Sequence, residues 1–123
     1  MKTCLVVDDS SVIRKVARRI LEGLDFEITE AEDGKQAMDR VASKMPDAIL
    51  LDWNMPNMDG YETAEKIRSN PKFLNLAVIA VTAKAMTGDR EKCIRAGASD
   101  YITKPVDVDQ LLSLLRVWLY DKI

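Results

Sequence analysis

Two kinds of segment alternate along the chain, and the spacing of their apolar residues distinguishes them. Short apolar runs, some continuous and some alternating with polar residues, predict five strands at 3–7, 26–31, 47–52, 76–82 and 100–103. Between these runs apolar residues recur every three or four positions, which predicts helices at 10–24, 33–44 and about 59–69, in a segment that ends at Gly97, and from about 108 to the end. Asp33 is placed to cap the second helix, and Gly97 suits the residue after the fourth.

Five strand–helix units with mostly continuous apolar strands indicate a parallel sheet that helices cover on both faces. The 123 residues suffice for one core, and no linker, repeat or low-complexity tract divides them. We therefore predict the α/β class, a doubly wound sheet and a single domain over 1–123. Ligands bind such sheets beyond the carboxyl ends of the strands, so the residues placed there are the candidates for function.

The composition narrows the range of partners. The chain is 47% hydrophobic and 31% charged with a net charge of −2, which gives no basic surface for nucleic acid or a membrane. No apolar run approaches the roughly 18 residues of a spanning helix, and no secretory leader opens the chain. Cys4 and Cys93 fall in a predicted strand and a predicted helix, which favours reduced thiols and a cytoplasmic location.

The chain contains no histidine. This absence removes the commonest general base, the usual zinc sites and every serine–histidine triad. Any chemistry must therefore use carboxylates, hydroxyls and lysines.

Polar residues with compatible chemistry follow the predicted strands. Asp8 and Asp9 follow the first strand, Asp52 ends the third, Thr82 ends the fourth and Lys104 follows the fifth. Three carboxylates at one edge repel one another unless a cation lies among them, and a set of oxygen ligands suits Mg²⁺ or Mn²⁺. A lysine and a hydroxyl beside them would bind an anion, and a carboxylate in their midst can be the nucleophile of a phosphoryl transfer.

Each of these residues also has an ordinary structural explanation. A strand-terminal aspartate often caps a helix or forms a turn, a threonine can simply end a strand, and a lysine is commonly solvated. Separate explanations do not account for five such residues at one edge of the sheet. We therefore predict a metal- and phosphate-binding site in which Asp52 is the nucleophile.

Four motifs resemble those of the receiver domain of bacterial two-component response regulators. They are VVDDS at 6–10, LLDWNMPNMDG at 50–60, VTA at 81–83 and YITKP at 101–105. The resemblance covers the whole chain and implies a flavodoxin-like (βα)5 fold with the sheet order 2-1-3-4-5, which the chemotaxis regulator CheY also has. It further implies a signalling switch that is activated by phosphorylation.

The resemblance assigns roles to the acidic residues. Asp52 would be the phospho-acceptor. Asp9 and Asp52 would bind Mg²⁺ directly and Asp8 through water, and the backbone carbonyl of Asn54 would complete the protein ligands. The side chains of Asn54 and Lys84 would tune how fast water attacks the phosphorylated aspartate.

The remaining site residues would respond to the phosphoryl group. Thr82 would move to hydrogen-bond it, Lys104 would pair with it, and Tyr101 would turn inward as Thr82 moves. The Lys104–Pro105 peptide bond would be cis.

The resemblance also implies the partners. The donor would be a sensor histidine kinase or a histidine phosphotransfer protein, because this chain has no histidine of its own. Phosphorylation would change the surface formed by the helix that ends at Gly97, the strand at 100–103 and the last helix. A downstream target protein would bind there. The chain would be a monomer or would form a weak dimer through the same surface. Apart from its own phosphorylation and dephosphorylation, the chain is not expected to be an enzyme.

Three further features carry expectations. The basic residues Arg14, Lys15, Arg18 and Arg19 of the first predicted helix are either a kinase-docking surface or a solvated face. An apolar stripe on the last helix is expected to pack on the core, through Val108, Leu111, Leu112, Leu115 and Leu119. Trp53, beside the acceptor, is expected to be exposed.

The two halves resemble different relatives within the family. Residues up to about 60 are similar to chemotaxis-type single-domain regulators, and the rest is similar to receivers of hybrid histidine kinases. A chimera joined near Gly60 is one hypothesis. Our first functional prediction is a chemotaxis-type regulator, and the alternative is a phosphorelay intermediate or a hybrid-kinase receiver module.

Two classes outside the family fit less well. An aspartate-nucleophile phosphatase needs an acid two residues after the nucleophile, where this chain has Asn54. A flavin-binding protein of similar fold would place its phosphate against three carboxylates, which would repel it.

Overall fold

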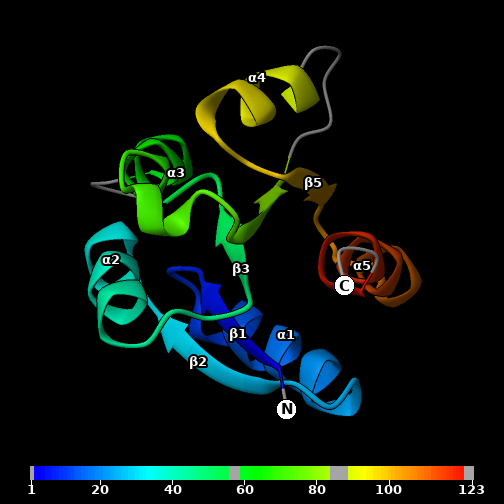
Figure 1. Ribbon diagram of the computed structural model, residues 1–123. Helices are drawn as coiled ribbons and strands as arrows, with labels where there is room; N and C mark the ends of the chain where they lie inside the picture. Colours follow the sequence, from blue (N-terminus) through cyan, green and yellow to red (C-terminus); the bar gives the residue numbers. More distant parts are fainter. Residues whose placement is uncertain (1, 56–58, 84–88, 121–123) are drawn as a thin grey trace.

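The five strands form one parallel sheet in the order β2-β1-β3-β4-β5, so the predicted fold class and strand order are confirmed (Figure 1). The computed structural model describes residues 2–55, 59–83 and 89–120. The strands are β1 (Thr3–Val7), β2 (Glu27–Ala31), β3 (Ala48–Asp52), β4 (Ala77–Thr82) and β5 (Asp100–Thr103). The α-helices are α1 (Ser11–Gly23), α2 (Gly34–Ser43), α3 (Gly60–Arg68), α4 (Asp89–Ala96) and α5 (Val108–Leu115). A 3₁₀ turn, η1 (Pro71–Phe73), precedes β4, and a π-helical turn, η2 (Arg116–Tyr120), follows α5.

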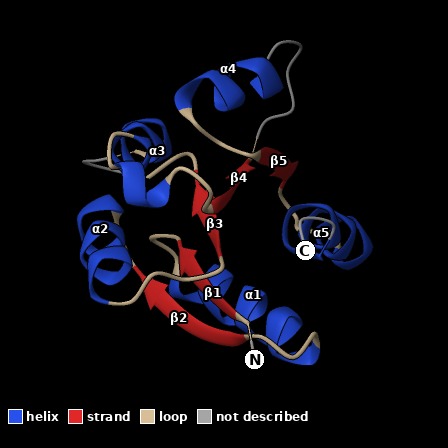
Figure 2. Ribbon diagram, in the orientation of Figure 1, coloured by secondary structure: helices blue, strands red, loops and turns tan. Residues whose placement is uncertain are grey.

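Successive strand residues point to opposite faces of the sheet, and each face has its own core. In β1, Val6 belongs to the same core cluster as Leu21 of α1 and Leu111 of α5, whereas Val7 belongs to the cluster that contains Ile67 of α3. Figure 2 shows the result, with α1 and α5 on one side of the sheet and α2 and α3 on the other. This explains why the predicted strands are apolar at successive positions rather than at alternate ones.

Short polar side chains start the helices as their sequence positions suggest. In each case the side chain accepts a hydrogen bond from the backbone N–H three residues later, and the capping residues are Ser10, Asp33, Asp59 and Asp107. The prediction for Asp33 is confirmed. Gly97, which follows α4, has a φ of 119°, a conformation that favours glycine, so the predicted helix end is also confirmed.

The last helix differs from its prediction. The α-helical part ends at Leu115 and the next five residues are π-helical, whereas the pattern had predicted one helix to the end. Val108, expected in the core, is 44% exposed because it lies in the first turn, ahead of the turns whose Leu111 and Leu115 are fully buried. Among the described residues, no helix combines the length and apolar character that crossing a bilayer would require.

Candidate functional site

The pairing of β1 with β3 brings two aspartates together. Val7 pairs with Leu51, so Asp8 and Asp52 each follow a paired residue at the same edge of the sheet. Side chains alternate along both strands, and Asp8 and Asp52 have the same parity as Val6 and Leu50, which face the α1–α5 core. Both carboxylates are therefore directed to one side of the strand ends.

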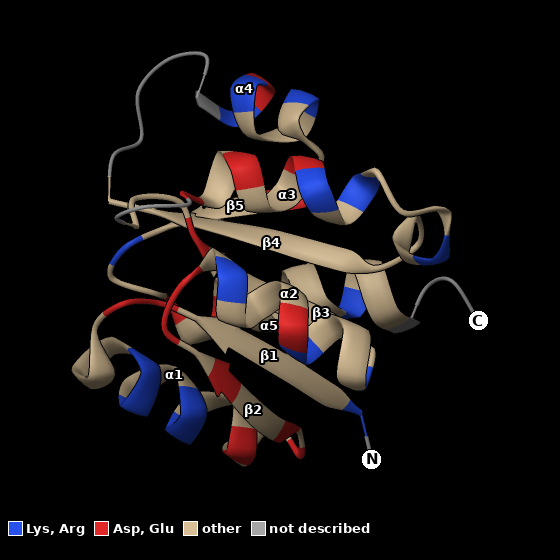
Figure 3. Ribbon diagram, turned by 90° about the vertical axis from the view of Figure 1, so that its left-hand side faces the viewer, with Lys and Arg blue, Asp and Glu red and all other residues tan. Residues whose placement is uncertain are grey.

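One carboxylate oxygen from each of Asp8, Asp9 and Asp52 lies within 4.8 Å of the others. Asp8 and Asp52 are only 3% and 2% exposed, whereas Asp9 is exposed. Figure 3 shows acidic segments at this edge of the sheet, beside the basic residues of α1. The structure thus brings together the three carboxylates that the sequence predicted.

Lys104 lies directly between the two buried carboxylates. Its Nζ is 3.2 Å from Asp8 Oδ2 and 3.2 Å from Asp52 Oδ1. Its backbone N–H donates to the carbonyl of Thr82 over 2.8 Å, which ties the loop after β5 to the end of β4. The Lys104–Pro105 bond is cis, as the resemblance implies.

Burial dominates the electrostatics of Asp52. It raises the pKa of this carboxyl, and the charge of Asp8 raises it further, against the opposing effects of the Asn54 N–H and of Lys104. Burial alone would lower the pKa of Lys104, but the charges and hydrogen bonds of Asp52 and Asp8 outweigh it and raise that pKa. One lysine therefore does not fully compensate the buried carboxylates.

The donor set fits a small divalent cation. Three carboxylates and one ammonium group leave an excess of negative charge, and oxygen is the ligand atom that Mg²⁺ prefers. An octahedral Mg²⁺ ion with oxygens about 2.1 Å away holds those oxygens roughly 3–4 Å apart. The carboxylate oxygens of Asp8, Asp9 and Asp52, which lie within 4.8 Å of one another, are close to that spacing.

The loop after β3 is held against the sheet. Asn54 N–H donates to Asp52 Oδ1 over 3.1 Å, and Trp53 N–H donates to the carbonyl of Val81 over 2.8 Å. The Trp53 ring meets Tyr61 edge-on, with centroids 6.4 Å apart. The expectation that Trp53 is exposed is wrong. Its side chain is partly buried, because it packs against two groups of buried residues, one that includes Ile67 of α3 and one that includes Cys93 of α4.

The two proposed switch residues lie on adjacent strands. Thr82 is 6% exposed at the end of β4. Tyr101 of β5 pairs with Ala80 of β4, two residues before Thr82. Its partly buried side chain packs against the cluster that contains Cys93. Lys84 lies outside the described residues.

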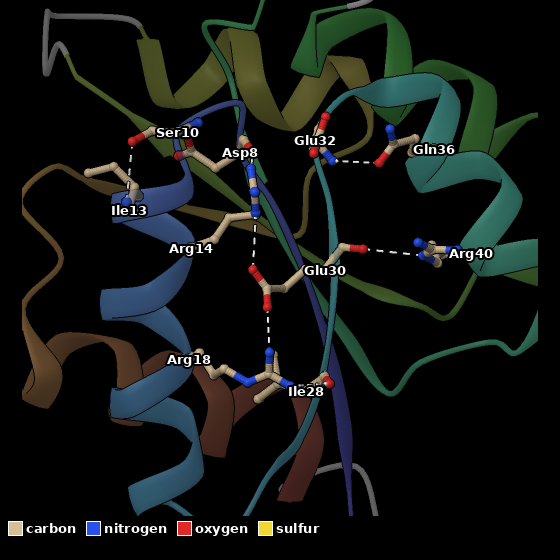
Figure 4. Close-up of polar contacts among 10 residues, drawn as sticks. All are labelled: Asp8, Ser10, Ile13, Arg14, Arg18, Ile28, Glu30, Glu32, Gln36 and Arg40. Atoms are coloured by element: carbon tan, nitrogen blue, oxygen red, sulfur yellow. Dashed lines mark hydrogen bonds and ion pairs between the residues drawn. The ribbon is translucent and has the colours of Figure 1, made fainter.

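Sequence reasoning missed the contact of Arg14 with the acidic site. Its Nη1 donates to the backbone carbonyl of Asp8 over 2.7 Å, and its Nε pairs with Glu30 of β2 over 3.0 Å (Figure 4). The only sequence signal was a glutamate near the end of the predicted strand at 26–31. Of the four basic residues on α1, Lys15 and Arg19 are exposed, whereas Arg14 and Arg18 are partly buried.

Comparisons with known proteins agree on one family. A family model described as the response regulator receiver domain matches residues 4–116. The sensor histidine kinase CheAY of Helicobacter pylori is 39% identical over 114 residues, which is 91% of this chain and 14% of that protein. The chain also spans about half the length of other curated relatives that it matches, at 49% and 52% of two of them.

Solved structures are similar over nearly their whole length. The chemotaxis protein CheY4 of Vibrio cholerae has a TM-score of 0.90 at 28% identity, with 97% of this chain and 99% of that chain covered. The receiver domain of the sensor histidine kinase PA1611 of Pseudomonas aeruginosa has a TM-score of 0.88 at 35% identity, with 97% and 98% covered. That neighbour has a magnesium ion coordinated in its active site cleft.

Proposed function

The chain belongs to the family of response regulator receiver domains, and we propose on that premise that Asp52 accepts a phosphoryl group from a phosphohistidine of a partner kinase. Signalling by this family depends on phosphorylation. The observation that carries the proposal is the buried Asp52 carboxylate, 3.2 Å from Lys104 and beside two further aspartates that together suit Mg²⁺.

Asp52 would act as the nucleophile. Both hydrogen bonds that it accepts from the described residues end on Oδ1, so Oδ2 has lone pairs for attack on phosphorus. As the P–O bond to Oδ2 forms, the P–N bond of the phosphohistidine breaks, and its electron pair returns to the imidazole nitrogen. A divalent ion held by Asp8, Asp9 and Asp52 would neutralise the charge on the phosphoryl oxygens.

Lys104 would follow the negative charge. Without a phosphoryl group, its Nζ pairs with both Asp8 and Asp52, at 3.2 Å from a carboxylate oxygen of each. A phosphoryl group on Asp52 places additional negative charge within reach of the same ammonium group, which would then pair with it. Its side chain is already 23% exposed, so the amine has room to turn outward.

The output would be a change at the surface of α4, β5 and α5. Thr82 would move towards the phosphoryl group and Tyr101 would turn inward behind it. The α4 helix rests on a small cluster whose buried members are Ala80, Cys93 and Ala98, and the aromatic side chains of Trp53 and Tyr101 pack against it partly buried. Movement of Tyr101 would therefore change the support of α4 directly. A downstream target protein, or a second copy in a weak dimer, would bind the altered surface.

We place the chain among freestanding regulators of the chemotaxis type, with its kinase in the cytoplasm. The structural similarity to CheY4 supports this placement, and Cys4 and Cys93 are both buried thiols, as a reducing compartment allows. A receiver of a hybrid kinase or a phosphorelay intermediate is the second candidate, favoured by the 35% identity to the PA1611 receiver. In either case the chain catalyses only its own phosphorylation and dephosphorylation.

The test uses a small acyl phosphate in place of the kinase. Incubation with Mg²⁺ and the acyl phosphate should add one phosphoryl group to the intact mass, and removal of Mg²⁺ by a chelator should prevent the addition. Asp52→Asn should abolish the gain. Asp47→Asn, at the opposite end of β3, should keep it, and labelling of the Asp52→Asn variant would contradict the proposal.

A further inference from the structure

Arg14 joins the acidic site to β2. Its guanidinium contacts the backbone carbonyl of Asp8 over 2.7 Å and the carboxylate of Glu30 over 3.0 Å, as Figure 4 shows. Only 12% of the Arg14 side chain is exposed. This arginine is therefore a contact between helix and site loop, and it is unsuited to be part of an open docking face on α1.

Glu30 fixes the direction of the Arg14 guanidinium. One of its carboxylate oxygens pairs with Arg14 and the other with Arg18, while its backbone carbonyl accepts a hydrogen bond from Arg40 of α2 over 3.2 Å. Charge-assisted hydrogen bonds of this kind are roughly twice as strong as neutral ones. The side chain of Glu30 is 30% exposed, so these pairs are partly shielded from water.

Besides the ion pair with Lys104, Asp8 makes hydrogen bonds to Ala31, Ser10 and Arg14, and the one with Arg14 orients Asp9. The backbone N–H of Asp8 donates to Ala31 over 3.1 Å, and its Oδ1 accepts from the Ser10 N–H over 2.9 Å. The carbonyl that Arg14 binds belongs to the planar peptide group between Asp8 and Asp9. Fixing this plane fixes the direction in which the chain leaves β1, and with it the position of Asp9.

We propose that Arg14, oriented by Glu30, is a positioning residue that holds the carboxylates of Asp8 and Asp9 ready for a divalent cation. The inference rests on the proposed function, since it concerns the same site. Arg14 binds a main-chain oxygen and Glu30 lies behind it, so both act through the Asp8–Asp9 peptide. Losing such a supporting contact typically weakens metal binding by about 10–100-fold.

The experiment compares two arginines that share Glu30. Arg14→Met removes the contact with Asp8, whereas Arg18→Met removes an ion pair to Glu30 and leaves the Asp8 contact in place. Two quantities are measured on the full chain: Mg²⁺ affinity by calorimetric titration, and hydrogen exchange without metal at the hydrogen-bonded amides of Asp8 and Ser10. Arg14→Met should weaken Mg²⁺ binding about tenfold or more and accelerate hydrogen exchange at both amides. Arg18→Met should leave both quantities within about twofold of wild type.

Other outcomes would overturn the proposal. Wild-type Mg²⁺ affinity and exchange in Arg14→Met would show that the contact does not set the site. Equal loss of affinity in both variants would assign the effect to general loosening of α1. If the wild-type chain binds no Mg²⁺, the proposed function fails, and the amide exchange of Asp8 and Ser10 still decides the positioning role. Arg14→Lys, which keeps the charge but not the forked geometry, should show a smaller loss and serves if Arg14→Met does not fold.

Discussion

Arg68 connects three parts of the fold at the end of α3. Its Nε donates to the carbonyl of Gly97 over 2.7 Å, its Nη1 to Phe73 over 2.7 Å and to Leu74 over 3.3 Å, and its Nη2 to the Ser99 hydroxyl over 3.2 Å. Burial lowers the pKa of the guanidinium, which reflects the desolvation that these hydrogen bonds offset. Arg68→Met keeps most of the aliphatic stem and removes every one of these donors.

The expected cost follows from the two short hydrogen bonds. A hydrogen bond from a charged donor contributes about 1.5–3 kcal/mol, and partial access of water to the carbonyls reduces that loss. We expect Arg68→Met to lower the free energy of unfolding by about 2–4 kcal/mol. At roughly 4 °C per kcal/mol for a chain of this size, the melting temperature should fall by about 8–16 °C.

Urea denaturation followed by circular dichroism measures this loss. The matched control is Arg95→Met on the exposed side of α4, which should change the free energy of unfolding by less than about 0.5 kcal/mol. Arg68→Lys, with one donor group in place of a fork, should fall between wild type and Arg68→Met. If Arg68→Met and Arg95→Met are equally stable, the hydrogen bonds of Arg68 do not support the fold and the reasoning is refuted.

Two further predictions concern a glycine and a buried thiol. A Cβ on Gly60 would lie 2.7 Å from the carbonyl of Asp52 and from the Trp53 Cα, so Gly60→Ala should cost about 1–3 kcal/mol in urea denaturation and slow phosphorylation. Gly23→Ala is the control, because its Cβ would meet nothing within 4 Å, and equal behaviour of the two variants would contradict the close approach. Burial raises the pKa of Cys4 from 9.0 to about 12, so its stabilising contribution is complete below pH 9 and is lost as pH rises towards 12. Above pH 9 the free energy of unfolding of the wild type should fall by about 1.4 kcal/mol per pH unit relative to that of Cys4→Ala. The same dependence of this free energy on pH in both proteins would contradict the prediction.

The fold could be predicted because each element obeys a local rule. The predicted strands agree with the structure within one residue at each end, since an apolar run and the polar residue that ends it are both visible in sequence. The capping role of Asp33 and the left-handed Gly97 are equally local. The convergence of Asp8 and Asp52 followed from parallel strands alone, because parallel strands share a carboxyl edge.

The missed features depend on which residues become neighbours. Arg14 and Lys15 are both basic and adjacent in sequence on α1, but of the two only Arg14 pairs with Glu30, which is 16 residues away on β2. The burial of Trp53 depends on clusters supplied by α3 and α4. The exposure of Val108 depends on which turns of α5 reach the core, and these are the turns of Leu111 and Leu115. The hypothesis of a junction near Gly60 stays a prediction, which separate comparison of the two halves with their relatives would test.

The central claim is that Asp52 itself is covalently modified at a magnesium-dependent acidic site. The most direct measurement is borohydride reduction after phosphorylation with Mg²⁺ and an acyl phosphate, followed by mass spectrometry of the peptides. Because borohydride reduces an aspartyl phosphate to homoserine, the account predicts homoserine at position 52 and an unmodified Asp52 when Mg²⁺ is omitted. Homoserine at any other aspartate, or at none after full treatment, would contradict it.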